Sequence, residues 1–124
     1  MTKLSTIFLL IASGFSGIAE DYQKTRQDIS SAIQDGNFTE VKGLLVQLMP
    51  ELKQDLRQNK AFYHEVKKSL EPAELQELKL KIERKKEIYH SLEHLLNVTP
   101  AAIRARASSV VKLLDEYNRL EISA

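Results

Sequence analysis

The sequence predicts an all-α fold, an up-and-down antiparallel helical bundle of about four helices. Along most of the chain, apolar residues recur at alternating spacings of four and three, which is the period of helices that pack against neighbours. No segment alternates apolar and polar residues for long, so strand signals are almost absent. The connections are short, and short connections place consecutive helices antiparallel.

The first predicted helix runs from about Asp21 to Asp35. Its apolar face consists of Ile29, Ala32 and Ile33. Gly36 follows directly, and glycine tolerates the left-handed conformation that ends many helices. We therefore expect the helix to end at Gly36.

The second predicted helix is the longest. It begins at Asn37, whose side chain can cap a free backbone amide while Glu40 reaches back in a capping-box arrangement. Asn59 occupies one step of its heptad seam, where it either fixes register and oligomeric state as a buried asparagine or lies exposed at a bundle end. The apolar residues of this seam are Leu45, Met49, Leu52, Leu56, Tyr63, Val66 and Leu70.

Pro50 lies within this second segment. A proline inside a helix removes one backbone hydrogen bond and crowds the preceding turn, so the helix either kinks and continues or breaks and restarts at Pro50. We expect a kink, because the apolar residues keep the same phase on both sides of the proline. A break would more often reset that phase.

Two further helices follow. The third is predicted from near Pro72 to about Asn97, and the fourth opens with Thr99 as its cap and Pro100 at its first position. Lys85 interrupts the third seam, and we expect its ammonium to reach solvent at an edge of the bundle. The third seam contains Leu75, Leu78, Ile82, Lys85, Tyr89, Leu92 and Leu96, and the fourth contains Ile103, Ala107, Val110, Leu114, Tyr117 and Leu120.

Residues 1–19 have the pattern of a secretory signal peptide. Lys3 supplies the positive charge, and Gly17-Ile18-Ala19 supplies the small residues of a cleavage site. Leu4 to Ala12 form the apolar centre, for which a signal peptide needs roughly 7 to 15 residues. We expect cleavage after Ala19, export to the periplasm or the extracellular space, and a single helical-bundle domain over residues 20–124. Two alternatives stay open: an uncleaved anchor, although the segment is short for a membrane span, and an ordinary buried helix of a cytosolic bundle.

Composition narrows the classes of function. The chain has no cysteine, which excludes disulfides and every cysteine-ligated metal or haem site. Its formal net charge is +1, and loss of Lys3 with the signal brings it near neutral, which argues against nucleic-acid binding. Residues 79–87 form the densest basic run; interleaved acids favour a solvated helix face, and docking of an acidic partner or a phosphate surface is the alternative. We expect no stable membrane span after cleavage.

Recognisable catalytic motifs are missing. The sequence has no cysteine nucleophile, no G-x-S-x-G elbow and no glycine-rich phosphate loop, and its carboxylates have basic neighbours. A methionine–histidine haem pair is not expected, because Met49 is better explained as a seam residue and the last helix has no histidine. We therefore predict a non-enzymatic protein without catalytic, cofactor-binding or metal-ligating residues, in which Tyr63, Tyr89 and Tyr117 belong to the core.

The segment from His90 to His94 has the form H-x-x-E-H. This pattern resembles the zinc motif of the inverted zincin peptidases, in which two histidines hold zinc and the glutamate acts as base. Too little chain follows His94 for a third ligand and a catalytic domain, so we exclude peptidase activity. We expect solvent-facing histidines, and the alternative is a weak surface metal site closed by Glu93 or His64.

Two tripeptides, starting at Asn37 and Asn97, match the glycosylation acceptor N-x-[ST]. Both would lie in exposed connections between helices. Asn37 and Thr99 are already accounted for as helix caps, so the pattern leaves glycosylation of Asn37 and Asn97 open.

Together these observations predict an exported, non-enzymatic helical interaction module, such as an adaptor, an inhibitor or a chaperone-like protein. It would act by contacts with a protein partner or by self-association, through the long second helix or the seam from Leu75 to Leu96. Two alternatives stay open. One is a carrier of a small apolar ligand between the helices, and the other is a weak metal-binding protein that uses His90 and His94.

Overall fold

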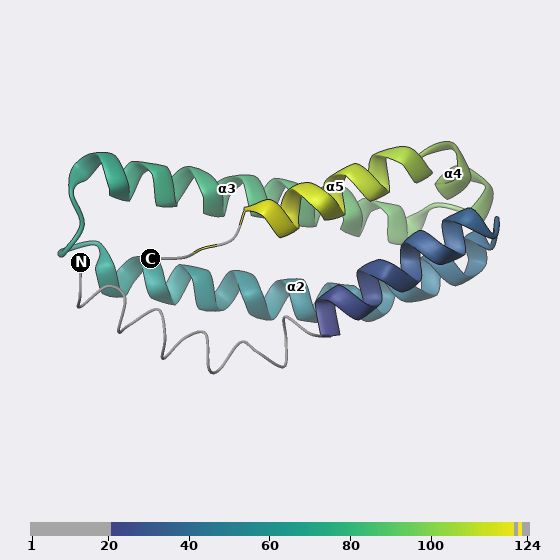
Figure 1. Ribbon diagram of the computed structural model, residues 1–124, viewed down its shortest axis with the longest axis horizontal. Helices are drawn as coiled ribbons and strands as arrows, with labels where there is room; N and C mark the ends of the chain where they lie inside the picture. Colours follow the sequence, from purple (N-terminus) through teal and green to yellow (C-terminus); the bar gives the residue numbers. More distant parts are fainter. Residues whose placement is uncertain (1–20, 121, 123–124) are drawn as a thin grey trace.

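The computed structural model describes residues 21–120 and 122, which form helices and no strand (Figure 1). The predicted all-α bundle is therefore confirmed. The expected signal peptide over residues 1–19 lies outside the described residues. The helices cover residues 21–34, α2 (Phe38–Val66), α3 (Pro72–His94), α4 (Pro100–Ala105) and α5 (Ala107–Arg119), with a 3₁₀ turn over Leu95–Asn97.

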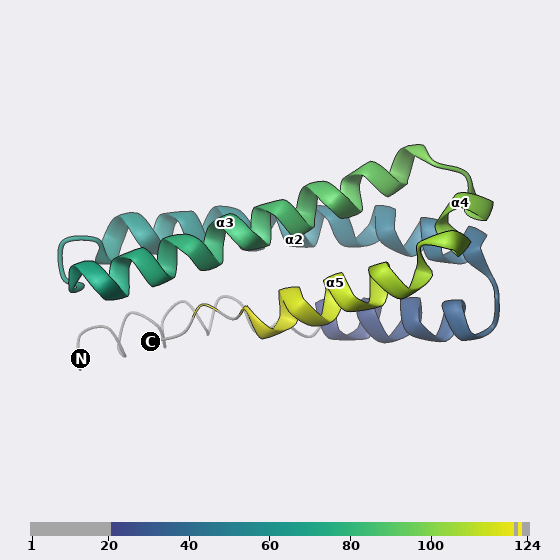
Figure 2. The same cartoon turned by 90° about the horizontal axis from the view of Figure 1, so that it is seen from above.

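The two longest helices, α2 and α3, form an antiparallel hairpin. The helix of residues 21–34 lies along the first part of α2, and α5 lies beside it and against α3 (Figures 1 and 2). Four helices therefore surround the core in one half of the molecule. Among the described helices, only α2 and α3 continue into the other half, and we call this part, residues 57–83, the hairpin end.

Buried apolar residues form two clusters that follow this division. The smaller cluster lies in the hairpin end, where Ile122 also packs, and its buried members are Phe62, Val66, Leu78 and Ile82. The larger cluster lies where four helices meet, and its members include Ile29, Leu45, Leu52, Ile88, Leu92, Ile103, Val110 and Leu114. The hairpin end thus has the smaller share of the apolar core.

The buried stripes on α2 and α3 are wider than the predicted seams. Leu48 and Phe62 on α2, and Ile88 on α3, are buried although they lie outside the predicted seams. Leu48 and Ile88 lie where these helices pack against more than one neighbour, and a helix in a bundle needs a broader apolar face than one strand of a two-stranded coiled coil. Phe62 lies in the hairpin end, where Ile122 also packs against the apolar cluster.

Local signals fixed the start of α2 as predicted. Gly36 has a φ of 72°, and the amide of Asn37 donates to the Ala32 carbonyl at 2.9 Å, which closes the preceding helix with a Schellman turn. The Asn37 side chain then accepts from the amide of Glu40 at 3.2 Å. Glu40 reaches back to the side-chain amide of Asn37, at 3.0 Å.

Pro50 lies inside α2, which continues through it to Val66. The prediction that the helix continues through Pro50 is therefore confirmed, and the predicted kink stays a prediction. Pro72 at the start of α3 and the cap formed by Thr99 before Pro100 are also confirmed; the Thr99 hydroxyl accepts from the amide of Ala102.

The C-terminal part of the chain corrects two boundaries. The α-helical part of the third helix ends at His94, and residues as far as Asn97 form the 3₁₀ turn. The predicted fourth helix is divided at Arg106, whose φ and ψ are −113° and 9°. The division has a tertiary cause, because α4 packs against α2 whereas α5 packs against α3, and the chain must change direction between them.

Candidate functional site

A buried polar layer crosses the bundle where the hairpin end meets the four-helix part. The Lys85 ammonium in α3 donates to the Asn59 side-chain oxygen in α2 at 2.5 Å. It also lies 2.7 Å from an Asp55 carboxylate oxygen one turn earlier in α2, and its own side chain is only 4% exposed. We call Asp55, Asn59, Lys85 and Tyr117 the polar layer.

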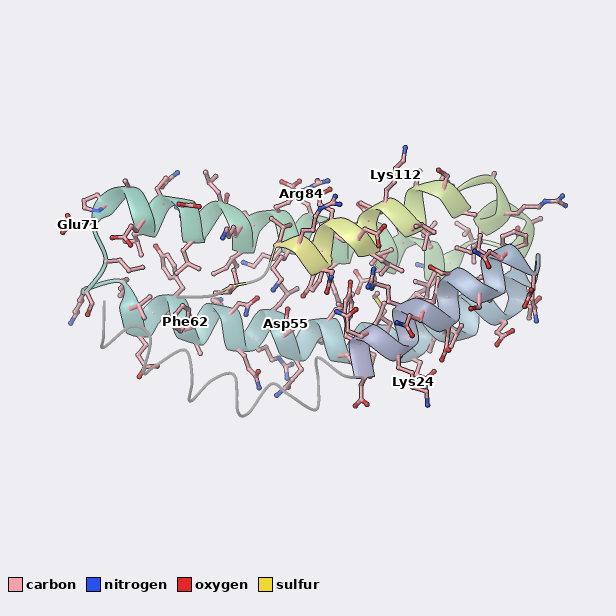
Figure 3. The ribbon with its side chains drawn as sticks, viewed as in Figure 1. Lys24, Asp55, Phe62, Glu71, Arg84 and Lys112 are labelled. Atoms are coloured by element: carbon pink, nitrogen blue, oxygen red, sulfur yellow. The ribbon has the colours of Figure 1, made fainter. Side chains whose placement is uncertain are left out.

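Tyr117 connects this layer to the rest of the core. Tyr117 lies near the end of α5, and its hydroxyl donates at 2.6 Å to Asp55, which is labelled in Figure 3. Its ring lies 4.8 Å from the Lys85 ammonium. The Tyr22 ring packs against the Tyr117 ring with centroids 5.8 Å apart. The Tyr22 hydroxyl donates to the Leu114 carbonyl at 2.7 Å. The layer therefore ties three helices together, and Tyr22 links it to the fourth.

Burial also controls the acid–base state of these tyrosines. It is the main cause that raises the pKa of Tyr117 far above its ordinary value, and the negative charge of Asp55 adds to this effect. Burial raises the pKa of Tyr22 in the same way. Both hydroxyls therefore stay protonated and donate hydrogen bonds at neutral pH. Each residue of the layer makes a side-chain hydrogen bond or ion pair within the fold, which is the arrangement of a structural element.

The structure corrects the expectation for Lys85. Its ammonium does not reach solvent at an edge of the bundle; it is buried, because Asp55 and Asn59 provide a carboxylate and an amide oxygen at hydrogen-bond distance. The same bond decides between the two interpretations of Asn59, which is buried. In the sequence, the signal for this polar layer is that Lys85 and Asn59 each occupy a seam position where an apolar residue is expected.

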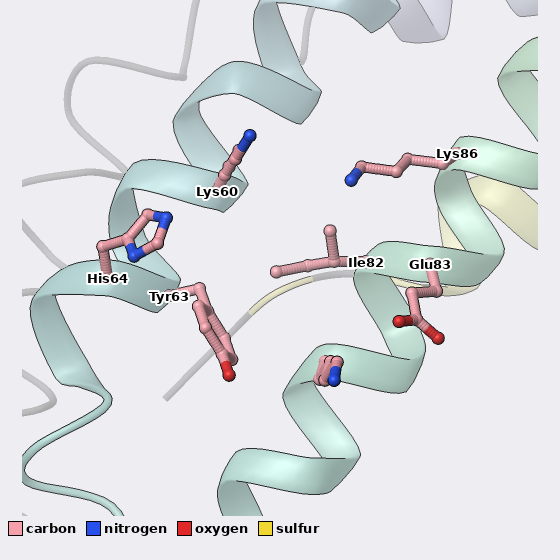
Figure 4. Close-up of a pocket in the computed structure, with 7 residues that line it drawn as sticks. Lys60, Tyr63, His64, Ile82, Glu83 and Lys86 are labelled. Carbon is pink, nitrogen blue, oxygen red and sulfur yellow. The ribbon is translucent and has the colours of Figure 1, made fainter.

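A groove lies between α2 and α3 near the hairpin end, with a volume of about 190 Å³ (Figure 4). Ile82 reaches from α3 toward Tyr63 of α2, and these two side chains form its apolar floor. Tyr63, expected in the core, is thus half-buried at this groove. The charged or titratable residues around the floor are Lys60, His64, Lys79, Glu83 and Lys86.

The basic run over residues 79–87 does not act as one surface. Arg84 forms a bidentate ion pair with Glu116 of α5, at 2.5 and 2.7 Å, and a second pair with Glu87. Lys85 is buried in the polar layer. Lys86 instead lines the groove. Helical geometry thus distributes neighbouring basic residues over three different surroundings.

The histidine pair is exposed, as predicted. His90 and His94 both face solvent, and the His90 ring lies 3.5 Å from a carboxylate oxygen of Glu93. His64 lines the groove together with Lys79 and Glu83, and both of these residues precede His90 in α3 by more than one helical turn. The structure therefore does not bring His64 to the histidine pair. Within residues 21–120 and 122, no group of three or more histidine or acidic side chains is placed to hold a metal ion.

No helix in the described part combines the length and the apolar character of a membrane span. No protein-family model, curated protein or solved structure matches this chain. The geometry of the hairpin end and its groove is therefore the basis for a functional proposal.

Proposed function

We propose that this protein is an exported, non-enzymatic helical interaction module, in the manner of an adaptor, an inhibitor or a chaperone-like protein. Its contacts with a protein partner are made by the hairpin end. The observation that carries this proposal is the extension of α2 and α3 beyond the other described helices, which leaves a two-helix structure with a groove on its surface (Figures 1 and 4).

Two features of the hairpin end support a contact surface. Leu80 is 54% exposed, as is Val46 in the four-helix part, and Leu80 lies two residues from Ile82, on a different face of α3 from the groove. The groove adds an apolar floor surrounded by charged side chains, and protein interfaces commonly combine an apolar centre with a polar rim.

The polar layer supports the non-enzymatic part of the proposal. A catalytic acid, base or nucleophile must reach a substrate, whereas the Lys85 ammonium and the Tyr117 hydroxyl are buried and bonded to Asp55. The carrier and metal alternatives have weaker support. The groove has only a short apolar floor, between Tyr63 and Ile82, and the histidine pair offers only His90 and His94 as strong ligands.

A photo-crosslinking experiment tests the contact surface. A benzophenone amino acid replaces Leu80 in the hairpin end, and the matched control carries it at Val46 in the four-helix part, because both side chains are 54% exposed. Crosslinking is carried out in cells of the source organism, and products are identified by mass spectrometry. We expect one discrete partner protein from position 80 and none in common from position 46. Equal crosslinking at both positions, or none at position 80, contradicts the proposal.

The export part has its own test. The mass of the protein isolated from outside the cytosol should correspond to a chain that begins at Glu20. A protein found only in the cytosol with Met1 to Ala19 still attached would contradict export, and would leave the crosslinking result unaffected.

A further inference from the structure

Lysines line one edge of the α2–α3 hairpin in heptad register. Lys60 on α2 and Lys67, which caps the C-terminus of α2, are seven residues apart, and on α3, Lys79 and Lys86 have the same spacing. Each directly follows a seam position. Because α3 runs opposite to α2, residues that follow the seam on the two helices lie on the same side of the hairpin. We call these four residues, with Lys53 one heptad before Lys60, the lysine edge.

The groove confirms that the two rows meet. Lys60 of α2 and Lys79 and Lys86 of α3 all line it. All members of the lysine edge are exposed. The groove residues include three lysines and one acid, Glu83, so the groove has an excess of positive charge. Such an arrangement costs stability unless another molecule supplies negative charge.

The lysine edge is free of the other described helices. Arg84 pairs with α5 through Glu116, and Lys86 lies two residues further along α3, about 200° around the helix axis. The edge therefore opens on the side of α3 that faces away from α5. From Lys53 to Lys67 it extends for about 21 Å at 1.5 Å per residue.

We propose that the lysine edge and its groove bind an acidic amphipathic helix of the partner protein, as the third helix of a local coiled coil. This inference rests on the proposed function and names the chemistry of the partner. An apolar side chain of that helix enters the groove above Ile82 and Tyr63. Glutamate or aspartate side chains on either flank of its apolar stripe then pair with Lys60 on α2 and with Lys79 and Lys86 on α3.

A helix fits these observations better than a membrane or a second copy of this chain. Ile82 is only 6% exposed and lies below the lysine side chains, so a flat lipid surface cannot reach the apolar floor. A second copy that presented the same edge would bring like charges together. A helix carries both an apolar ridge and charged flanks at the spacing of the lysines.

A designed peptide tests the inference in the full chain. The probe has about three heptads, with leucine at the seam positions and glutamate on both flanks, and the control peptide has lysine in place of the glutamates. Binding is measured by fluorescence anisotropy. The test variant combines Lys60→Glu, Lys79→Glu and Lys86→Glu. The matched variant makes the same charge change elsewhere, with Lys24→Glu, Arg104→Glu and Lys112→Glu, which are exposed in the four-helix part.

We expect the glutamate peptide to bind and the lysine peptide not to bind. The test variant should weaken binding at least tenfold while the matched variant stays within about threefold, and circular dichroism should show the same helix content in both. Raising the salt from about 0.1 M to about 1 M, where the Debye length falls to about 3 Å, should also weaken binding.

Three outcomes overturn the inference: no binding of the glutamate peptide, equal weakening in both variants, or binding of anionic phosphatidylglycerol vesicles with the same dependence on the lysine edge. These outcomes can be distinguished from a failure of the proposed function. If position 80 still crosslinks to a partner while the lysine substitutions have no effect, the hairpin end is an interaction surface and the acidic helix is wrong.

Discussion

The Lys85 ammonium in α3 lies 2.7 Å from the Asp55 carboxylate in α2, in a position where the lysine side chain is 4% exposed. A buried ion pair adds little net stability compared with apolar residues, but it strongly disfavours arrangements that separate its two charges. A shift of α3 along α2 by one heptad would leave Lys85 against apolar side chains such as Leu52 or Val66. The pair therefore fixes the register of the hairpin, and with it the alignment of the two lysine rows.

Removal of one residue of this ion pair should destabilise the protein. We expect Asp55→Ala to lower the free energy of unfolding by about 3 kcal/mol, because it leaves the Lys85 ammonium buried without its carboxylate. Urea denaturation at pH 7 measures the change. The control replaces the whole polar layer, with Asp55→Leu, Asn59→Leu, Lys85→Met and Tyr117→Phe together, and should recover most of the loss. If the single substitution costs less than about 0.5 kcal/mol, the register argument fails.

The buried tyrosines should make the fold sensitive to alkaline pH. The pKa values of Tyr22 and Tyr117 are raised in the folded protein, mainly by burial. Their contribution is therefore fully present below the unfolded pKa of about 10 and decreases as the pH rises above it. The urea concentration at the denaturation midpoint should decrease as the pH rises above about 10. In the double variant Tyr22→Phe, Tyr117→Phe this midpoint should decrease less steeply. Parallel curves for the two proteins would contradict this assignment.

The contribution of the ion pair between α3 and α5 to stability should be lost at acidic pH. The hydrogen bonds from Arg84 lower the pKa of Glu116, so its contribution is present above the unfolded pKa of about 4.3 and is lost as the pH falls through the lower folded value. Both side chains are about a third or more exposed, which limits the contribution to well under about 1 kcal/mol. Glu116→Gln should therefore lower stability slightly at pH 7 and not at about pH 2. An equal effect at both pH values would exclude the ion pair as its cause.

Gly36 should resist substitution for a backbone reason. Its φ is 72°, and a Cβ placed there would meet no atom within 4 Å, so the cost of Gly36→Ala is conformational and not steric crowding by neighbours. We expect a loss of about 1 kcal/mol in the free energy of unfolding. Gly43→Ala, in a helix interior with equally open space, is the control and should be neutral or stabilising. An equal change in the free energy of unfolding in the two variants would show that the left-handed turn at Gly36 is not needed.

Hydrogen exchange should distinguish the two halves of the molecule. Amides near Phe62 and Leu78 belong to the hairpin end, where the smaller apolar cluster lies, whereas those near Leu48 and Leu92 lie among four helices. We expect faster exchange in the hairpin end, because fewer apolar contacts oppose local opening. Addition of the glutamate peptide should slow exchange there and leave the four-helix part unchanged. Uniform protection along α2 would contradict this division.

Much of the fold could be predicted because its signals are local. Gly36, Asn37, Pro72 and Thr99 each act on backbone groups within about four residues, so the helix boundaries that they control were predicted correctly. The division of the last helix at Arg106 could not be predicted. It depends on α4 packing against α2 and α5 against α3, and no capping side chain marks it.

The candidate site was predictable only in part. The sequence showed the unusual residues, Asn59 and Lys85 in apolar seams and a basic run after Leu78, but not their surroundings. Lys85 was expected at a solvent edge, because a single seam does not reveal which side chains of the neighbouring helix lie opposite. Its partner Asn59 is 26 positions away in the chain.

By itself, then, the sequence determined the helical class, the long second helix through Pro50 and most helix ends, because helical period and capping are properties of short segments. Only the tertiary structure decided that Lys85 is buried on Asp55, that α2 and α3 extend beyond the other described helices, and that lysines from both form one edge of a groove. Those features depend on how distant helices align, and their alignment is set by packing and by paired buried charges.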